Sequence, residues 1–488
     1  MNKDLSFEDA EKLINVKIRQ SENLQQKLRA LFCVLVFVPI FLFVLLPIVI
    51  IYKIYSLITK KKKSTKKTQI TDQVPEIELL DKKETQNRKF DVVIYGATGF
   101  TGTLAAKYFA ENYSLANVKW AIAGRSTQKL AALKENLVSL NQDLKNLEIL
   151  VAESQDVEQL RKIVNDTKVV ISLAGPFAKY GSILVQLCAL YGTHYADITG
   201  EVSWVRQMIA KYDDKAVRSG AKIINCSGAD CIPWDILTMK MVEQAKKNFP
   251  QEEIKIVQHV DFMNGGVSGG TFTTLQYSLT NPIKTSSLGY DPLQKAIGED
   301  KKIEKKHTSS FPFIGYEKKI RKFVGKFFNA QVNSAIIKRS NILLNYSDKL
   351  VYKESLVYNN LFDLIINQAF ALLMGSMIMC KPLWDLLYPL VLPQTGQGPT
   401  DEQMNMGYMK LQSYVYNGKG QTLSKGQFLI TKDPGYIETA KMVCETGIAL
   451  LELKDKKNIQ GGFFTPASGL GQQILDRLIN KQMFIKVE

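Results

Sequence analysis

One run of seven residues has the composition of a phosphate-binding loop, because glycine recurs in it at every third position. The first glycine permits a tight turn, the second lets the backbone approach a pyrophosphate, and the third allows close packing of a helix on a strand. The amino end of the following helix offers free N–H groups to phosphates. The run differs from the usual GxGxxG pattern, yet its context predicts dinucleotide binding. It comprises Gly96, Ala97, Thr98, Gly99, Phe100, Thr101 and Gly102.

The next apolar stretch bears on the choice of cofactor. Domains that prefer NAD carry an acidic residue about 20 positions further on, which binds the ribose 2′-hydroxyl. Here the stretch ends in Gly124, Arg125 and Ser126, with no acid from Trp120 to Ser126. An arginine can instead hold a 2′-phosphate through charge-assisted hydrogen bonds. We therefore predict NADP as the cofactor, bound by these three residues; a plain surface arginine is the alternative.

A second group of residues is expected on the substrate side. Ala174, Gly175 and Pro176 follow another apolar stretch and should approach the nicotinamide, because ligands bind outside the carboxyl ends of parallel strands. Tyr180 and Asp230 lie on later loops and are candidates for substrate contact or proton donation. Either could instead be a turn or packing residue. The three histidines and six cysteines show no metal-ligand spacing, so we predict no metal site.

Short apolar stretches alternate with amphipathic ones after Phe90, which indicates βαβ units and a parallel sheet. Beyond 251 the order is less regular: 254–263 is strand-like, and 316–328 has apolar residues at helical spacing among lysines. Such a helix could lie on a membrane or dock on the core. The apolar run 369–380 is too short to span a bilayer, so it is expected in the core or in the wall of a lipid-accepting cavity. Strands are predicted at 90–95, 120–123, 147–151, 169–173, 194–198 and 222–225, and helices at 103–112, 127–139, 156–164 and 183–190.

The amino-terminal part has the features of a membrane anchor. Residues 30–52 are 23 consecutive residues without a charge, enough for a helix that spans the hydrocarbon core. Pro39 and Pro47 also suit a hairpin in one leaflet, so both arrangements stay open. Lysines cluster just after the segment, and the positive-inside tendency places the catalytic part in the cytosol. Endoplasmic reticulum, lipid droplet and mitochondrial membranes are not distinguished.

The formal net charge of +16 does not indicate a nucleic-acid partner, because the basic residues form no stripe interleaved with aromatics. Many of them lie beside the apolar segment, where lysines contact lipid headgroups. Residues 30–67 are therefore expected to bind membrane lipid. Oligomerisation stays open.

Eight motifs in one order resemble those of the saccharopine dehydrogenase-like oxidoreductases, a family related to the trans-acting enoyl reductases. The resemblance covers about 88–488 and departs from the family at Phe177, Ala229 and Cys231, which leaves the substrate chemistry open. It does not imply activity on saccharopine. The motifs are GATGFTG at 96–102, AGRS at 123–126, AGPFAKYG at 174–181, DITGE at 197–201, CSGADCIPWD at 226–235, SGGT at 268–271, GPT at 398–400 and GGFFTPASGLG at 461–471.

The resemblance implies a doubly wound Rossmann-type α/β fold with an inserted second α/β domain containing a mixed sheet. We expect a membrane-anchored NADPH-dependent oxidoreductase that transfers hydride to or from a lipid-like substrate. The alternative is a non-catalytic Rossmann protein that binds dinucleotide as a structural or regulatory partner. The expected parts are a polar segment (1–29), the anchor (30–52), a basic tether (53–89), the Rossmann domain (90–235), a second domain with membrane-facing segments (236–430) and a segment returning to the first domain (431–488).

Overall fold

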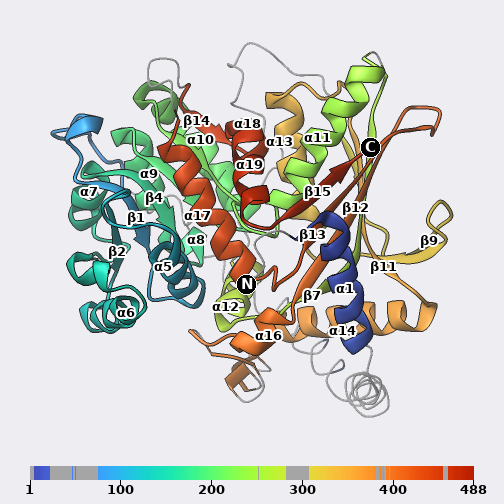
Figure 1. Ribbon diagram of the computed structural model, residues 1–488, viewed down its shortest axis with the longest axis horizontal. Helices are drawn as coiled ribbons and strands as arrows, with labels where there is room; N and C mark the ends of the chain where they lie inside the picture. The colour runs from blue at the N-terminus through green and yellow to red at the C-terminus, as the bar shows by residue number, and fades with distance from the viewer. Residues whose placement is uncertain are drawn as a thin grey trace, which may run out of the picture.

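The protein is described by a computed structural model that contains two β-sheets side by side, each covered by helices (Figure 1). The first sheet lies on the left of that view and the second on the right. The structure describes residues 5–21, 47, 50, 75–250, 252–281, 307–380, 384–386, 388–389, 392–394, 396–453 and 460–488.

In the described part of the chain the first sheet has seven strands, which are parallel in every pairing and follow the order β14-β6-β5-β4-β1-β2-β3. The chain therefore reverses direction across the sheet between β1 and β4. In open α/β sheets this switch point is where ligands bind. The strands are β1 (Phe90–Tyr95), β2 (Trp120–Gly124), β3 (Glu148–Val151), β4 (Thr167–Ser172), β5 (His194–Asp197), β6 (Lys222–Ile224) and β14 (Gly462–Phe464).

Helices cover both faces of the first sheet because side chains alternate along each strand. Val92 and Ile94 of β1 pack with one set of helices, and Val93 and Tyr95 with the other. The first set is α5 (Phe100–Asn112), α6 (Thr127–Leu140) and α17 (Ile437–Leu451), and the second is α7 (Val157–Asn165), α9 (Ser182–Tyr191) and α10 (Val202–Ser219). The predicted doubly wound parallel sheet is confirmed.

The second sheet is mixed, as expected, and runs in the order β15-β13-β12-β7-β11-β10-β9, with β8 also paired to β11. Among the described residues, only the β7–β11 and β8–β11 pairs are parallel. Its strands are β7 (Lys255–Asn264), β8 (Thr308–Ser310), β9 (Ile314–Glu317), β10 (Lys322–Gly325), β11 (Val351–Tyr358), β12 (Tyr408–Tyr416), β13 (Thr422–Ile430) and β15 (Phe484–Val487).

One face of the second sheet packs against α11 (Ile232–Asn248) and α13 (Ala330–Leu343), and their apolar side chains join the larger core of the first sheet. The other face contacts α1 (Phe7–Ser21), whose Ala10 and Ile14 pack on Tyr408 and Leu429. The other helices of the described residues are mostly short, apart from α12 and α14. They are η4 (Thr85–Asn87), η5 (Gln142–Asn146), α8 (Phe177–Tyr180), α12 (Gly269–Thr280), α14 (Leu361–Met379), α16 (Asp401–Asn405), α18 (Pro466–Gly469) and α19 (Gln472–Asn480).

The last part of the chain contributes to both sheets. Helix α17 packs on α5 and β4, and β14 extends the first sheet beside β6. Strand β15 instead pairs with β13 in the second sheet. We expected residues 431–488 to pack against the first domain. Helix α17 and strand β14 do so, whereas β15 belongs to the second sheet.

One sequence prediction in the second domain is wrong, and another is right for only part of its residues. Residues 316–328 do not form an amphipathic helix: β9 and β10 form an antiparallel hairpin, with Arg321 in the left-handed region at φ 52°. The apolar run 369–380, expected in the core or in a cavity wall, forms the second half of a longer helix, α14, which begins at Leu361 because the Asn360 side chain caps it by accepting from Asp363 N at 2.8 Å. Met377, Ile378 and Cys380 are buried, whereas Phe370, Leu372 and Met379 are exposed.

The membrane-related predictions are only partly covered by the described residues. Apart from residues 47 and 50, the expected anchor 30–52 lies outside them. Among the helices that the structure describes, α14 alone, with 19 residues, is long and apolar enough to cross a bilayer by length and composition. The described end of the expected tether is packed rather than free, since Arg88 is buried and donates from Nη1 to Thr167 O at 2.9 Å.

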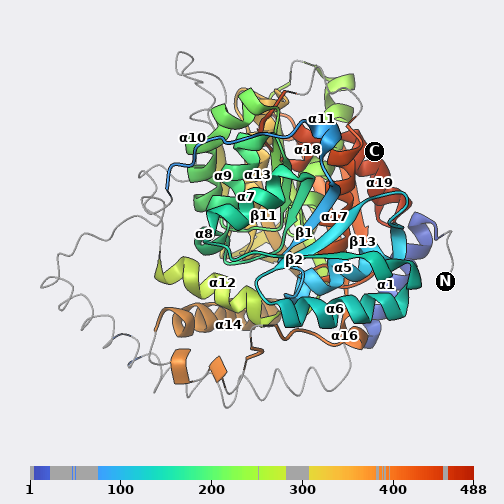
Figure 2. The ribbon, with the colours of Figure 1, turned by 90° about the vertical axis from the view of Figure 1, so that its left-hand side faces the viewer.

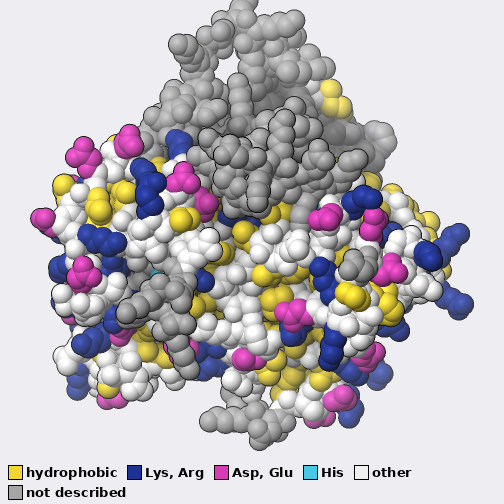
Figure 3. Space-filling model, turned by 90° about the horizontal axis from the view of Figure 1, so that it is seen from above, with side chains coloured by type: hydrophobic (Ala, Val, Ile, Leu, Met, Phe, Trp, Pro, Cys, Tyr) yellow, Lys and Arg dark blue, Asp and Glu magenta, His cyan; other side chains and the backbone are white. Residues whose placement is uncertain are grey.

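The face seen in Figure 3 carries lysine and arginine side chains interspersed with aspartate and glutamate. Its described surface therefore has no continuous basic stripe of the kind that binds a nucleic-acid backbone.

Candidate functional site

The glycine loop follows β1 and fits against the loop after β4. Gly96 has a φ of 81°, and a Cβ there would lie 2.7 Å from the Ala174 nitrogen. A Cβ at Gly102 would lie 2.1 Å from the Gly96 carbonyl oxygen. Both positions therefore require glycine. Gly96 lets the glycine loop meet the loop after β4 at the switch point, and Gly102 lets α5 begin directly against the glycine loop.

Gly99 differs from these two glycines because the protein leaves room beside it. It is the N-cap of α5, and no side chain caps this helix. A Cβ at Gly99 would have its nearest contact at 3.4 Å, with the Gly96 carbonyl oxygen. The uncapped N–H groups and the positive end of the helix dipole form an anion site, and a side chain at 99 would reduce the space beside it.

The turn after β2 lies beside the glycine loop. A Cβ at Gly124 would be 3.8 Å from the Thr98 hydroxyl oxygen. Arg125 is exposed, and within the described part of the chain it forms no hydrogen bond or ion pair, so its guanidinium is available to a phosphate. Ser126 has a structural role as the N-cap of α6, since its hydroxyl accepts from Lys129 N at 3.4 Å. Its own proton can still be donated to a ligand.

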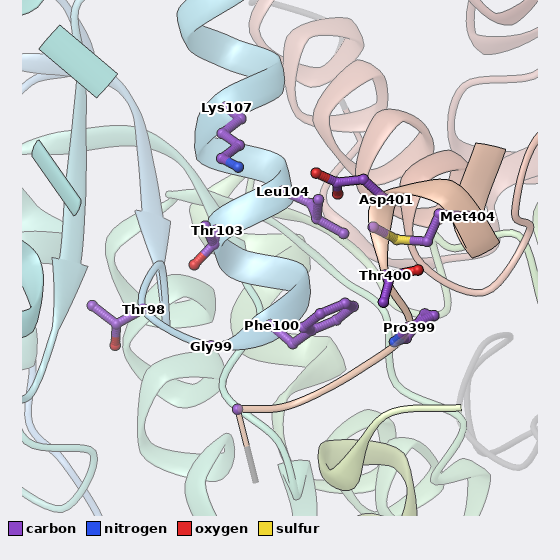
Figure 4. A pocket seen from close by; sticks show the side chains of 11 residues that line it. Thr98, Gly99, Phe100, Thr103, Leu104, Lys107, Pro399, Thr400, Asp401 and Met404 are labelled. Carbon is purple, nitrogen blue, oxygen red and sulfur yellow. The ribbon is translucent and has the colours of Figure 1, made fainter. Parts of the chain in front are cut away.

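A pocket of about 380 Å³ opens beside the glycine loop (Figure 4). Lys107 and Thr103 of α5 lie on one side of it, and the segment around Thr400 and Asp401 lies on the other. Phe100 holds the two sides together, because a Cβ at Gly398 would lie 2.5 Å from its ring. Thr98, Gly99, Phe100, Thr103, Leu104, Lys107, Gly396, Pro399, Thr400, Asp401 and Met404 line the pocket.

These features fit the predicted cofactor. The glycines leave a backbone cradle, the amino end of α5 can accept phosphates, and a free cation follows β2. NADP would be held by residues 96–102 and by Arg125.

The loop after β4 faces α12, at the edge of the sheet where a nicotinamide is expected. A Cβ at Gly175 would lie 3.4 Å from the Thr274 hydroxyl oxygen. Pro176 precedes α8, which Tyr180 ends, and Lys179 Nζ lies 4.9 Å from the centre of the Tyr180 ring. Ala174, Gly175 and Pro176 thus lie between the cofactor loop and α12, and Tyr180 lies one short helix away.

Two acids of the sequence motifs organise these loops. Both oxygens of Glu201 accept backbone N–H bonds, from Phe177 at 2.6 Å and from Ala178 at 3.0 Å. Its burial raises its pKa to about 7. Asp197 accepts bonds from Thr199 N at 3.1 Å and Asn225 Nδ2 at 2.7 Å, and its burial raises its pKa to about 6. We conclude that these acids position loops and are not free to contact substrate.

Asp235 joins another pair of motifs. It accepts from Ser340 Oγ at 2.5 Å and from Ala467 N at 2.8 Å, which ties α11 to α13 and α18. Burial raises its pKa to about 6. The CSGADCIPWD and GGFFTPASGLG motifs are thus linked by a buried carboxyl with a structural role.

Asp230 has a different environment from the other motif acids. Its side chain is reachable by solvent, yet protein surrounds it closely enough that desolvation raises its pKa to about 6, and the Asp433 carboxylate contributes to the same shift. No protein hydrogen bond holds its carboxyl group among the described residues. Asp230 and Tyr180 come from separate elements, and no hydrogen bond joins them. Of the two candidates, Asp230 has the properties of a proton donor.

Tyr436 connects the cofactor loop to α12, and Asp433 holds the Tyr436 backbone by accepting from its N–H at 2.6 Å. The sequence did not identify either as a site residue. The Tyr436 ring meets Phe100 edge-on at 5.0 Å, and its hydroxyl bonds Thr271 Oγ1 at 2.9 Å and accepts from Ser268 N. Asp433 accepts from Gly266 N at 2.9 Å. The signal in the sequence that could have pointed to this region was the pair of motifs SGGT and GPT, because residues of both lie at the site.

Comparison with known proteins supports this description. The family described as "Saccharopine dehydrogenase NADP binding domain" matches residues 92–224, which include the glycine loop, Arg125 and the loop after β4. The fold and this domain define the chain as an NADP-dependent oxidoreductase of the Rossmann type. The predicted cofactor is confirmed. Within that class the chain resembles the saccharopine dehydrogenase-like oxidoreductases, as its motifs predicted.

The curated relatives extend beyond this domain. A putative trans-acting enoyl reductase of Mycobacterium tuberculosis is 29% identical over 412 residues, covering 80% of this chain and 96% of the relative. The trans-acting enoyl reductase of Mycobacterium ulcerans is 28% identical over 417 residues, with the same shares. Among solved structures, apo saccharopine dehydrogenase (L-Glu forming) from Saccharomyces cerevisiae matches with 12% identity, a TM-score of 0.47, and 82% and 99% coverage of the two chains.

Proposed function

We propose that this protein is an NADPH-dependent reductase that acts on an enoyl-type, lipid-related substrate at a membrane surface, with its catalytic part in the cytosol. The observation that carries the proposal is the meeting of the glycine loop, the loop after β4 and α12 at the switch point of the first sheet. The names of the relatives support the enoyl group as the reacting class.

The groups on the substrate side suit an uncharged acceptor. Two threonines of α12 have hydroxyl groups near this region, Thr271 beside Tyr436 and Thr274 beside Gly175, and a hydroxyl can donate a hydrogen bond to a carbonyl oxygen. NADPH supplies a hydride when bound. The protein's own task is then to orient the acceptor and to deliver one proton, so that a C=C bond gains two hydrogens in total.

Asp230 is the proposed proton donor. With a pKa of about 6, it exists in both protonation states near neutral pH, which suits a general acid. Asp433 contributes by placing a second negative charge nearby, which favours the protonated form of Asp230. Tyr180 is proposed as a substrate contact from α8.

The membrane part of the proposal rests on the uncharged run 30–52 and the lysines after it. A substrate with a long apolar chain resides in the bilayer, so an anchored enzyme meets it at high local concentration.

The test is NADPH oxidation by the detergent-solubilised full chain with enoyl, keto and aldehyde lipids. We expect turnover with an enoyl lipid and none in Gly99→Val, the matched variant in which the anion site is filled. NADPH binding by the wild type without oxidation of any acceptor would instead support the non-catalytic alternative.

A further inference from the structure

Helix α14 exposes an apolar face although it belongs to a folded domain. Its inward side holds the apolar Leu364 and Ile378 together with the polar Gln368, whose Nε2 donates to Lys326 O at 3.2 Å. Surface helices in water normally carry polar residues on their outward side, whereas the outward side of α14 is mainly apolar. The exposed side chains, with their exposed fractions, are Leu361 (44%), Phe362 (57%), Ile365 (48%), Phe370 (51%), Leu372 (56%) and Met379 (50%).

The neighbouring helix α12 extends this face. It contacts α14 and adds the exposed side chains of Leu275 and Leu279. Both helices lie at the lower side of the molecule in Figures 1 and 2. We call this surface the α12–α14 face. Contiguous exposed apolar surface of this kind marks a site that is covered by lipid or by another protein.

The chemistry of the face favours lipid. Beyond Asp363 and Asn367 in its first two turns, α14 carries no charged or amide side chain on its exposed side. Protein interfaces usually have a polar rim. Lys326 beside α14 and Lys179 beside α12 are exposed, and such lysines bind anionic headgroups.

The course of the amino-terminal helix gives a second argument. Glu11 of α1 pairs with Lys410, and Lys17 further along donates to the carbonyl of Asn405 in α16. Helix α1 therefore runs toward α16, which also lies at the lower side of Figure 1. The uncharged run 30–52 follows shortly afterwards in the sequence. A bilayer that holds this run would be on the side of the α12–α14 face.

We propose that the α12–α14 face docks on a phospholipid membrane, with its exposed side chains inserted among the acyl chains. Helix α12 then connects the lipid surface to the reaction centre, because its Thr274 faces Gly175 at the switch point. A lipid substrate could move along α12 without crossing water. This last step rests on the proposed function, whereas the docking does not.

The experiment uses the full chain in vesicles of anionic phospholipid with brominated acyl chains, which quench tryptophan fluorescence on contact. Phe370→Trp and Leu372→Trp report on the face, and Leu140→Trp, exposed to 55% on α6, is the matched control. The native Trp120, Trp204, Trp234 and Trp384 are buried and give the background. We expect a blue-shifted emission and several-fold stronger quenching at 370 and 372 than at 140.

Two results would overturn the docking. Quenching at 370 and 372 no stronger than at 140, with no blue shift of the emission, would mean that the face stays in water. A blue shift without quenching would mean that protein covers it, as in a dimer. The readout needs neither substrate nor turnover, so failure of the reductase proposal leaves it unaffected.

Discussion

The glycine loop and the substrate side of the same cleft are built in different ways. The glycine loop would bind the cofactor phosphates through its backbone N–H groups, so it needs open space beside the backbone. The structure shows which glycines leave that space. The substrate side is built from side chains, and most of its motif acids are already engaged in holding loops together. A motif residue in the glycine loop therefore indicates ligand binding directly. A motif acid on the substrate side indicates it only when no protein group already occupies its carboxyl oxygens.

The largest effects of substitution are expected in the glycine loop. One of its glycines is needed for stability of the fold and another for NADPH binding, so two variants test these roles separately. Gly102→Val should destabilise the first domain, because its Cβ position is 2.1 Å from the Gly96 oxygen. Gly99→Val should keep the melting temperature and lose NADPH affinity by about a hundredfold or more, since a side chain there fills the anion site. Calorimetric titration and thermal unfolding of both variants measure this. Unchanged affinity in Gly99→Val would contradict the assigned site.

Asp230→Asn tests whether the substrate side contains a catalytic acid. Loss of a general acid typically lowers kcat by about a hundredfold to ten-thousandfold. In the wild type, the active protonated form is lost as pH rises through the folded pKa of about 6, so kcat should fall about tenfold per pH unit above it. Steady-state pH profiles of both proteins are the measurement. A wild-type profile that is flat from pH 6 to 8 would exclude this role.

Arg125→Ala tests the choice of cofactor. A charge-assisted hydrogen bond contributes about 1.5 to 3 kcal/mol, so NADPH should bind about tenfold to a hundredfold more weakly. NADH should be almost unaffected, because it has no 2′-phosphate. Both nucleotides are titrated against both proteins at one salt concentration. Equal losses for the two nucleotides would show that Arg125 supports the fold instead.

Glu201→Ala should have the smallest effect on cofactor binding and a clear effect on stability. It leaves the N–H groups of Phe177 and Ala178 without their acceptor in a buried place, which costs about 1 to 3 kcal/mol per group. We expect a lower unfolding free energy in denaturant, with NADPH affinity changed by less than about threefold. A stable variant with strongly weakened NADPH binding would instead place Glu201 in the cofactor site.

The sequence by itself determined the first domain and its cofactor. Its strands and helices have strong local periodicity, and the glycine loop acts through backbone that its own residues specify. Arg125 could be predicted as a 2′-phosphate contact for the same reason, because that prediction depends only on its position at the end of one strand.

Only the tertiary structure decided the second domain and the substrate side. Residues 316–328 have helical spacing, yet β9 and β10 pair as a hairpin and β10 also pairs with β11. The hydrogen bonds to the distant strand β11 outweigh the local pattern. Tyr436 reaches the site from far along the chain through its contacts with Phe100 and Thr271. Whether a motif acid is free, as Asp230 is, or engaged, as Glu201 is, depends on partners that the fold brings from other segments.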